Sequence, residues 1–198
     1  MPTPIRGAFL VEIEHRDDPR GFFARLWCRE EFSAQGIPID MVQASVSHNA
    51  VAGTVRGMHF QLPPSREGKL VRCERGRIHD VIIDLRPDAP TFTRHHAVTL
   101  DADSRNALYV PPGVAHGFQT LRDDCDVYYM MSDYYSPALQ AGVRWNDAAF
   151  GIAWPIAKVT IHPRDAAYPD FDPGAFAAEY ARRAAASPGL LNDIRMAD

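Results

Sequence analysis

The stretch from Arg56 to Asp84 constrains the fold more than any other part of the chain. It reads RGMHFQLPPSREGKLVRCERGRIHDVIID, in which short apolar and β-branched segments alternate with breaks at Pro63-Pro64 and Arg75-Gly76. Short strands separated by proline and glycine turns at close spacing are typical of antiparallel barrels and sandwiches. The stretch therefore predicts a mainly β protein.

Similar segments surround this central stretch, and the pattern changes only towards the C-terminus. Further strands are predicted over 8–14, 22–27, 41–47, 91–100, 115–121 and 127–132. Asp172-Pro173 has the sequence of a helix N-cap followed by proline at the first helical position. Helix formers follow from Ala175 to Ala186, and Pro188-Gly189 ends them. We expect one domain over 1–198, with a barrel over about 5–150 and a C-terminal segment and small helix over about 151–190.

Composition excludes several classes of protein. The net charge of −4 gives no reason to expect a nucleic acid or a membrane surface as partner. No apolar run approaches the ~20 residues that a membrane span needs, and the N-terminus lacks the apolar core of a signal peptide. Cys28, Cys73 and Cys125 are odd in number and lack metal-ligand spacing, which predicts reduced thiols in a cytoplasmic protein.

Three groups in the central stretch carry chemistry: Arg56, His59 and Lys69. A fixed cation, a titratable imidazole and an ammonium on one barrel face suit an anionic substrate that undergoes acid–base chemistry. Taken alone, His59 could equally be a satisfied core histidine, and Lys69 a solvated surface cation.

A second histidine, His116, follows a Pro/Gly turn in PPGVAHGF. Gly57 and Gly117 flank the two histidines, where a bulge or a close backbone approach would redirect side chains. Two strand histidines first suggest a metal cupin, but the i, i+2 partner of His59 is Gln61. Since two histidines are a poor ligand set for a transition metal, we expect no metal and no other cofactor.

Without a metal, the same groups suit proton transfer. A neutral imidazole, whose ordinary pKa is about 6.5, accepts a proton near pH 7 when an anion orients it. Asp80, Asp84 and Asp165 are all possible partners, and the residues alone do not choose among them. A tyrosine cluster adds phenols that could donate a proton or stack on a base: Tyr128, Tyr129, Tyr134 and Tyr135.

At this point the chain resembles a known family. The segments RGMHFQ, GKLVRCERGRIHDVIIDLR, PTF, PPGVAHGF, SDYYSP and WNDAAFGIAWP are similar, in this order, to those of the dTDP-4-dehydrorhamnose 3,5-epimerase family. The resemblance covers roughly residues 5–169. It implies a metal-free cupin-type double-stranded β-helix, or jelly roll, that forms homodimers with exchanged N-terminal strands. It also implies a cytoplasmic enzyme that acts on nucleotide-linked 4-keto-6-deoxy sugars.

The resemblance also implies roles for individual residues. By motif, His59 matches the catalytic base, Asp165 its carboxylate partner, Lys69 the lysine near the keto oxygen, and Tyr129 the acid on the opposite face. Substrate-binding positions are matched by Arg20, Gln43, Arg56 and His116, with Tyr135 or Tyr134 stacking on the nucleobase.

Several substrate-contact positions depart from the family pattern. They are Arg25 in place of a carboxylate, Ser45 in place of an asparagine, Met130 in place of a lysine, Gln140 in place of a glutamate, and Arg164 in place of a lysine. These differences predict a changed substrate rather than a changed reaction, and leave open the nucleotide, the sugar, and epimerisation at one carbon or two. The alternatives are a 3,4-ketoisomerase, a non-catalytic nucleotide-sugar-binding cupin and a metal cupin oxygenase.

Overall fold

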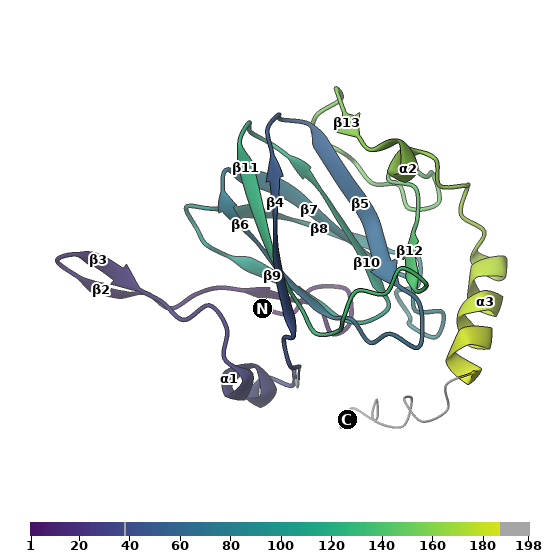
Figure 1. The fold of residues 1–198 in the computed structure, drawn as a ribbon, viewed down its shortest axis with the longest axis horizontal. Helices are drawn as coiled ribbons and strands as arrows, with labels where there is room; N and C mark the ends of the chain where they lie inside the picture. The colour runs from purple at the N-terminus through teal and green to yellow at the C-terminus, as the bar shows by residue number, and fades with distance from the viewer. Residues whose placement is uncertain (38, 187–198) are drawn as a thin grey trace.

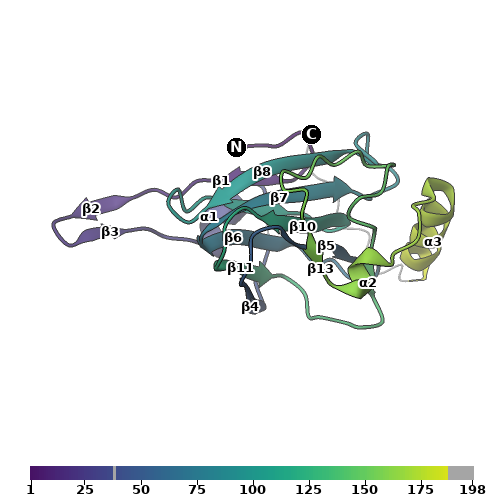
Figure 2. The same ribbon diagram turned by 90° about the horizontal axis from the view of Figure 1, so that it is seen from above.

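The computed structural model describes residues 1–37 and 39–186, which form two facing β-sheets with a helix at one end (Figures 1 and 2). The first sheet has five strands, in the order β1 (Phe9–Val11), β9 (Ala107–Val110), β6 (Lys69–Arg75), β11 (Cys125–Met131) and β4 (Gln43–Asn49). The second has the order β12 (Gln140–Gly142), β5 (Thr54–Gln61), β10 (Val114–Thr120), β7 (Arg77–Asp84) and β8 (His95–Asp101), with β13 (Thr160–Ile161) beside β5. The predicted mainly β architecture is confirmed.

Among the described residues, all strand pairs are antiparallel except one. β13 runs parallel to β5, with Thr160 opposite Thr54, an exception that the sequence did not indicate. Three of the predicted strands were too long. The 8–14 segment is a strand only over β1, Phe9–Val11. The 22–27 segment is extended only over β3 (Gly21–Phe23), where β2 (Arg16–Asp18) pairs with it, and the 91–100 segment becomes a strand only at His95.

The main core lies between the two sheets. The strand period of two sends alternate residues of β7 inward, so that Ile78 and Ile82 pack with Val71, Phe118 and Val127. Val81 and Ile83 of β7 point outward, and they too are buried, because the C-terminal segment covers that face with Phe150, Trp154, Phe171 and Phe176. Burial on both faces explains why β7 reads as an almost continuous β-branched run.

The helices lie at the periphery. α3 (Pro173–Ala185) confirms the predicted C-terminal helix, and the Asp172 carboxylate caps it by accepting hydrogen bonds from the backbone N–H groups of Gly174 and Ala175. α1 (Arg29–Ala34) follows the β2–β3 hairpin, and α2 (Pro163–Ala166) lies beside β5. The predicted stop at Pro188-Gly189 lies outside the described residues. Within the described residues, no helix is long and apolar enough to span a membrane.

The β2–β3 hairpin projects away from the two sheets in both views (Figures 1 and 2). All six of its strand residues are exposed. It carries large apolar side chains into solvent, with Phe23 65% exposed and Phe22 41% exposed. We refer to residues 16–23 as the arm.

Candidate active site

The predicted catalytic residues surround one cavity of about 820 Å³. Its walls come from both sheets, with β4, β6 and β11 on one side and β5 and β10 on the other, and the 160–165 segment borders it. Most of the strand residues that line it are alternate residues facing inward, such as Gln43, Ser45 and Ser47 of β4.

A bulge in β5 brings Arg56 and His59 to this cavity together. Three residues apart, they would face opposite sides of a regular strand. Opposite β10, however, His116 pairs with His59 and Phe118 pairs with Arg56, so β5 contains one extra residue between the two pairs.

Glycine permits this bulge. Gly57 has φ +124°, and a Cβ atom there would lie 2.6 Å from the Cα atom of Gly117. A side chain at either position would force the two strands apart. The predicted close backbone approach at Gly57 and Gly117 is confirmed.

Asp165 is the carboxylate that pairs with His59. The Nε2 atom of His59 lies 2.9 Å from Oδ1 of Asp165, which is 2% exposed. The other carboxylate oxygen accepts a hydrogen bond of 3.4 Å from the Gly57 N–H group in the bulge, and Arg164 Nε lies 3.2 Å from Oδ1. Burial alone would raise the pKa of Asp165, but the hydrogen bond and charge of His59, with Arg164 and Gly57, outweigh it and hold the pKa below its ordinary value.

The other two possible partners are engaged elsewhere. Asp84 is fully buried and bonds to Arg86 and Thr91. Asp80 lies 2.8 Å from Nε2 of His116 and forms a second buried histidine–aspartate pair. Of the three aspartates that the residues alone left open, the geometry therefore identifies Asp165 as the partner of His59.

Tyr129 lies on the inward face of β11, across the cavity from β5. Its ring meets the ring of His116 edge-on, at a centroid distance of 6.0 Å. Burial and then the nearby Asp80 carboxylate raise the pKa of the phenol, so Tyr129 keeps its proton at neutral pH. It can therefore act as a proton donor.

Lys69 opens β6 at the cavity wall, where its Nζ atom lies 3.2 Å from Glu67 and 3.3 Å from the backbone carbonyl oxygen of His59. Glu67 was not among the predicted site residues, although it also lines the cavity. Its position two residues before Lys69 in an extended chain is the signal that could have identified it.

The cavity mouth carries most of the predicted substrate-binding residues. The backbone N–H of Tyr135 donates to Gln43, and its phenol donates to Gln140 at 2.6 Å, so the ring is held in place although it is 57% exposed. Arg56 donates only to the Asn49 side chain and the His48 carbonyl oxygen, so within the described residues it has no carboxylate partner. Tyr134, 69% exposed, does not line the cavity, whereas Arg164 does.

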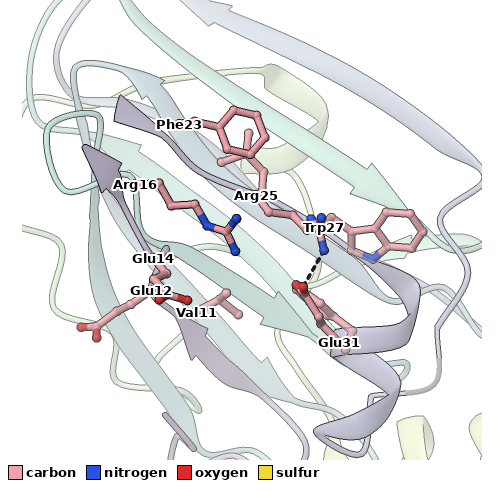
Figure 3. Close-up of a pocket in the computed structure, with 10 residues that line it drawn as sticks. Val11, Glu12, Glu14, Arg16, Phe23, Arg25, Trp27 and Glu31 are labelled. Atoms are coloured by element: carbon pink, nitrogen blue, oxygen red, sulfur yellow. Dashed lines mark hydrogen bonds and ion pairs between the residues drawn. The ribbon is translucent and has the colours of Figure 1, made fainter. Parts of the chain in front are cut away.

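Besides Tyr134 and Gln140, two more predicted binding residues, Arg20 and Arg25, do not line this cavity. Arg20 is at the tip of the arm, where it forms an ion pair with Asp18. Arg25 lines a smaller pocket of about 220 Å³ where the arm joins the body, and it donates to Glu31 there (Figure 3). The structure therefore does not bring Arg20 and Arg25 together with His59 of the same chain.

Among the described residues, no cluster of three or more histidine, cysteine, aspartate or glutamate side chains could hold a metal ion. The chemistry that the site itself offers is proton transfer. A histidine–aspartate pair lies on one wall and a protonated phenol on the other, and the Lys69 ammonium lines the same cavity.

Comparison with known proteins agrees with this chemistry. The profile of the family described as dTDP-4-dehydrorhamnose 3,5-epimerase matches residues 2–173. A dTDP-4-dehydrorhamnose 3,5-epimerase of Salmonella typhimurium is 36% identical over 174 residues, which are 87% of this chain and 94% of the relative. A dTDP-4-dehydrorhamnose 3-epimerase of Streptomyces niveus is 38% identical over 165 residues, covering 83% and 79% of the two chains.

The fold is also similar to solved structures. The crystal structure of a dTDP-4-dehydrorhamnose 3,5-epimerase from Bacillus anthracis, with TDP and PPi bound, superposes with a TM-score of 0.84 at 38% identity. It covers 86% of this chain and 98% of the other. This likeness extends the agreement from the sequence motifs to the cupin-type arrangement of the two sheets.

Proposed function

The chain belongs to the dTDP-4-dehydrorhamnose 3,5-epimerase family, and we propose that it epimerises a nucleotide-linked 4-keto-6-deoxy sugar at C3, C5 or both. The observation that carries this proposal is the placement of His59 and Tyr129 on opposed walls of one cavity. Epimerisation requires removal of a proton from one face of a carbon and its return to the other. A base and an acid on opposite sides supply both steps.

In the proposed reaction, His59 removes the hydrogen next to the C4 ketone. The C–H electron pair forms the C=C bond of an enolate, and the carbonyl electrons move to the C4 oxygen. Asp165 stabilises the imidazolium that results, and Lys69 donates a hydrogen bond to the oxyanion. Tyr129 then delivers its proton to the opposite face of the carbon. Proton exchange with solvent restores the imidazole and the phenol.

The cavity mouth is the proposed site of the nucleotide. Arg56 is suited to a diphosphate oxygen because its charge is not neutralised by a described carboxylate. The Tyr135 ring, held by Gln43 and Gln140, is suited to stack on the base. Ser45 and Gln140, two of the changed positions, lie at or beside this region, which supports a nucleotide sugar other than the usual dTDP sugar.

We further propose a cytoplasmic homodimer in which the arm lies against the partner. The arm exposes Phe22 and Phe23. The edge strand β4 exposes Val46, which is 67% exposed, and Val42 is exposed just before this strand. Exposed apolar residues on an arm and on an unpaired edge strand favour aggregation. A second copy of the chain that packs against them would remove them from water. In such a dimer Arg20 would reach the partner's cavity. Sedimentation at micromolar concentration should give a dimer, and a monomer would contradict this.

The reaction is tested by incubating the protein in D₂O with dTDP- and CDP-linked 4-keto-6-deoxyglucose and following deuterium uptake by NMR. Uptake with inversion at C3, C5 or both is expected. His59→Asn should abolish uptake at every carbon. Tyr129→Phe should retain uptake with unchanged configuration, because His59 can return a deuteron to the face from which it removed the proton. Uptake that persists in His59→Asn but vanishes in Tyr129→Phe would reverse the two roles.

This experiment also separates the competing functions. A 3,4-ketoisomerase would move the carbonyl group to C3, and a binding protein would leave the sugar unchanged. Equal or better turnover of the dTDP sugar than of every other nucleotide sugar tested would refute the proposed change in nucleotide.

A further inference from the structure

Lys69 is held in an unusually defined way for a lysine. It is one of only two lysines in the chain, the other being Lys158. Its side chain is 14% exposed, and the Glu67 carboxylate beside it is 10% exposed. Nζ lies 3.2 Å from Oε2 of Glu67 and donates to the His59 carbonyl oxygen at 3.3 Å. The ammonium therefore has two protein acceptors inside the cavity wall.

Glu67 is itself fixed from the other side. Its Oε1 atom accepts a hydrogen bond of 3.1 Å from the Gln61 side-chain amide, which also donates to the Tyr134 carbonyl oxygen at 3.3 Å. The Gln61 carbonyl oxygen accepts from the Ser136 N–H group at 3.0 Å. Each carboxylate oxygen of Glu67 thus has a separate partner, so the carboxylate cannot rotate without breaking a contact.

This arrangement has a geometrical consequence. An ammonium group has three N–H donors, and a lysine side chain is flexible enough to point them in many directions. With two donors engaged by Glu67 and His59, the third is left for the cavity that Lys69 lines. Glu67 also supplies the charge that compensates a mostly buried cation, which would otherwise be costly to keep there.

We propose that Glu67 is a positioning residue that directs the Lys69 ammonium at the substrate oxygen. The kinetic consequence rests on the proposed epimerase function, whereas the coupling between Glu67 and Lys69 does not. Two measurements on the full chain therefore test the coupling and the kinetic consequence separately.

The first measurement is the acetylation rate of Lys69 by acetic anhydride, relative to that of Lys158 in the same molecule, read by mass spectrometry. In Glu67→Ala the ratio should rise about tenfold, the size expected when a hydrogen bond between charged groups is lost. Glu67→Gln, which keeps an acceptor oxygen but not the charge, should lie between this variant and the wild type. Glu74→Gln is the matched control, since Glu74 lies in the same strand as Lys69 but contacts Arg72 instead. Its ratio should not change.

The second measurement is steady-state epimerisation. A hydrogen bond that strengthens as charge develops on the substrate oxygen affects kcat more than KM. Glu67→Ala should lower kcat by about 10–100-fold and change KM by less than about threefold, and Glu67→Gln should recover part of kcat. A raised KM with unchanged kcat would overturn the proposal by making Glu67 a substrate-binding residue.

An unchanged acetylation ratio in both Glu67 variants would also overturn the proposal that Glu67 positions Lys69. If Glu67→Ala does not fold, the isosteric Glu67→Gln decides alone, and a wild-type ratio there refutes the coupling. If the wild type itself shows no epimerisation, the proposed function fails, while the acetylation ratio still decides the role of Glu67.

Discussion

Asp165→Asn is the substitution that tests the catalytic pair most directly. It is nearly isosteric, but it replaces an anion that accepts from His59 at 2.9 Å by an amide whose NH₂ group can donate. The imidazole would then be held in the wrong tautomer, and its protonated form would lose the adjacent charge. The change also leaves the Gly57 N–H group with a weaker acceptor.

The expected magnitude follows from the burial of the pair. Removing one partner of a buried ion pair costs about 3–5 kcal/mol, and each 1.36 kcal/mol on a barrier is about tenfold in rate. The Asp165 side chain is 3% exposed, but that of His59 is 26% exposed, so water screens part of the interaction. We therefore expect kcat to fall by about 10²–10³, the lower part of the range.

The assay is the initial rate of deuterium uptake, with Asp170→Asn as control because Asp170 is on the surface, its side chain 85% exposed. Asp165→Asn should keep KM within about threefold of the wild type, since the carboxylate stabilises the imidazolium rather than the bound substrate. A kcat within a factor of three of the wild type, in a variant that folds normally, would refute the reasoning.

Three further outcomes are expected. Extended treatment with a chelator should leave epimerisation unchanged, and full loss restored by one divalent ion would contradict this. Asp84 has a pKa below its ordinary value of 3.8, because its hydrogen bonds to Arg86 and Thr91 outweigh the effect of burial. Its contribution to stability is therefore present above pH 3.8 and lost as the pH falls through the lower folded-state pKa. Asp84→Asn should lower the free energy of unfolding by about 3 kcal/mol at pH 7, and by less in strong acid, as measured by urea unfolding at both pH values. Gly117→Ala would place a Cβ 2.7 Å from the Arg56 carbonyl oxygen, so it should lower the free energy of unfolding by about 1–3 kcal/mol and reduce kcat. Gly174→Ala should do neither, because its Cβ would meet only Oδ1 of Asp172, at an ordinary contact distance of 3.4 Å.

The fold was largely predictable because its strands are bounded by strong turn residues and α3 begins at a strong cap. The Asp172-Pro173 pair indicated the start of α3, and hydrogen bonds to the Asp172 carboxylate explain why. The arm was less predictable. The 22–27 segment contains apolar residues that read as a buried strand, yet Phe23 is 65% exposed, because apolar character alone does not say which surface covers a side chain.

Within the site, the pairing of histidines with aspartates needed the three-dimensional structure. Asp80, Asp84 and Asp165 are equivalent as sequence features, and only the position of α2 beside β5 brings Asp165 to His59. Glu67 was missed for a related reason. A glutamate near a turn is usually solvated, and its burial here depends on Gln61 and on the 134–136 segment, which is far away in sequence.

The bulge at Gly57 explains how Arg56 and His59 can share one cavity although their spacing does not suit a regular strand. Arg56 and His59 are an odd number of residues apart, so a regular strand would send one of them out of the cavity. The extra residue in β5 restores a common face and frees the Gly57 N–H group from the ladder, and Asp165 accepts that group while it also orients His59. The same carboxylate therefore accepts the N–H group that the bulge releases and orients His59, the proposed base. This dual contact explains why a catalytic constellation can depend on two glycines that carry no chemistry of their own.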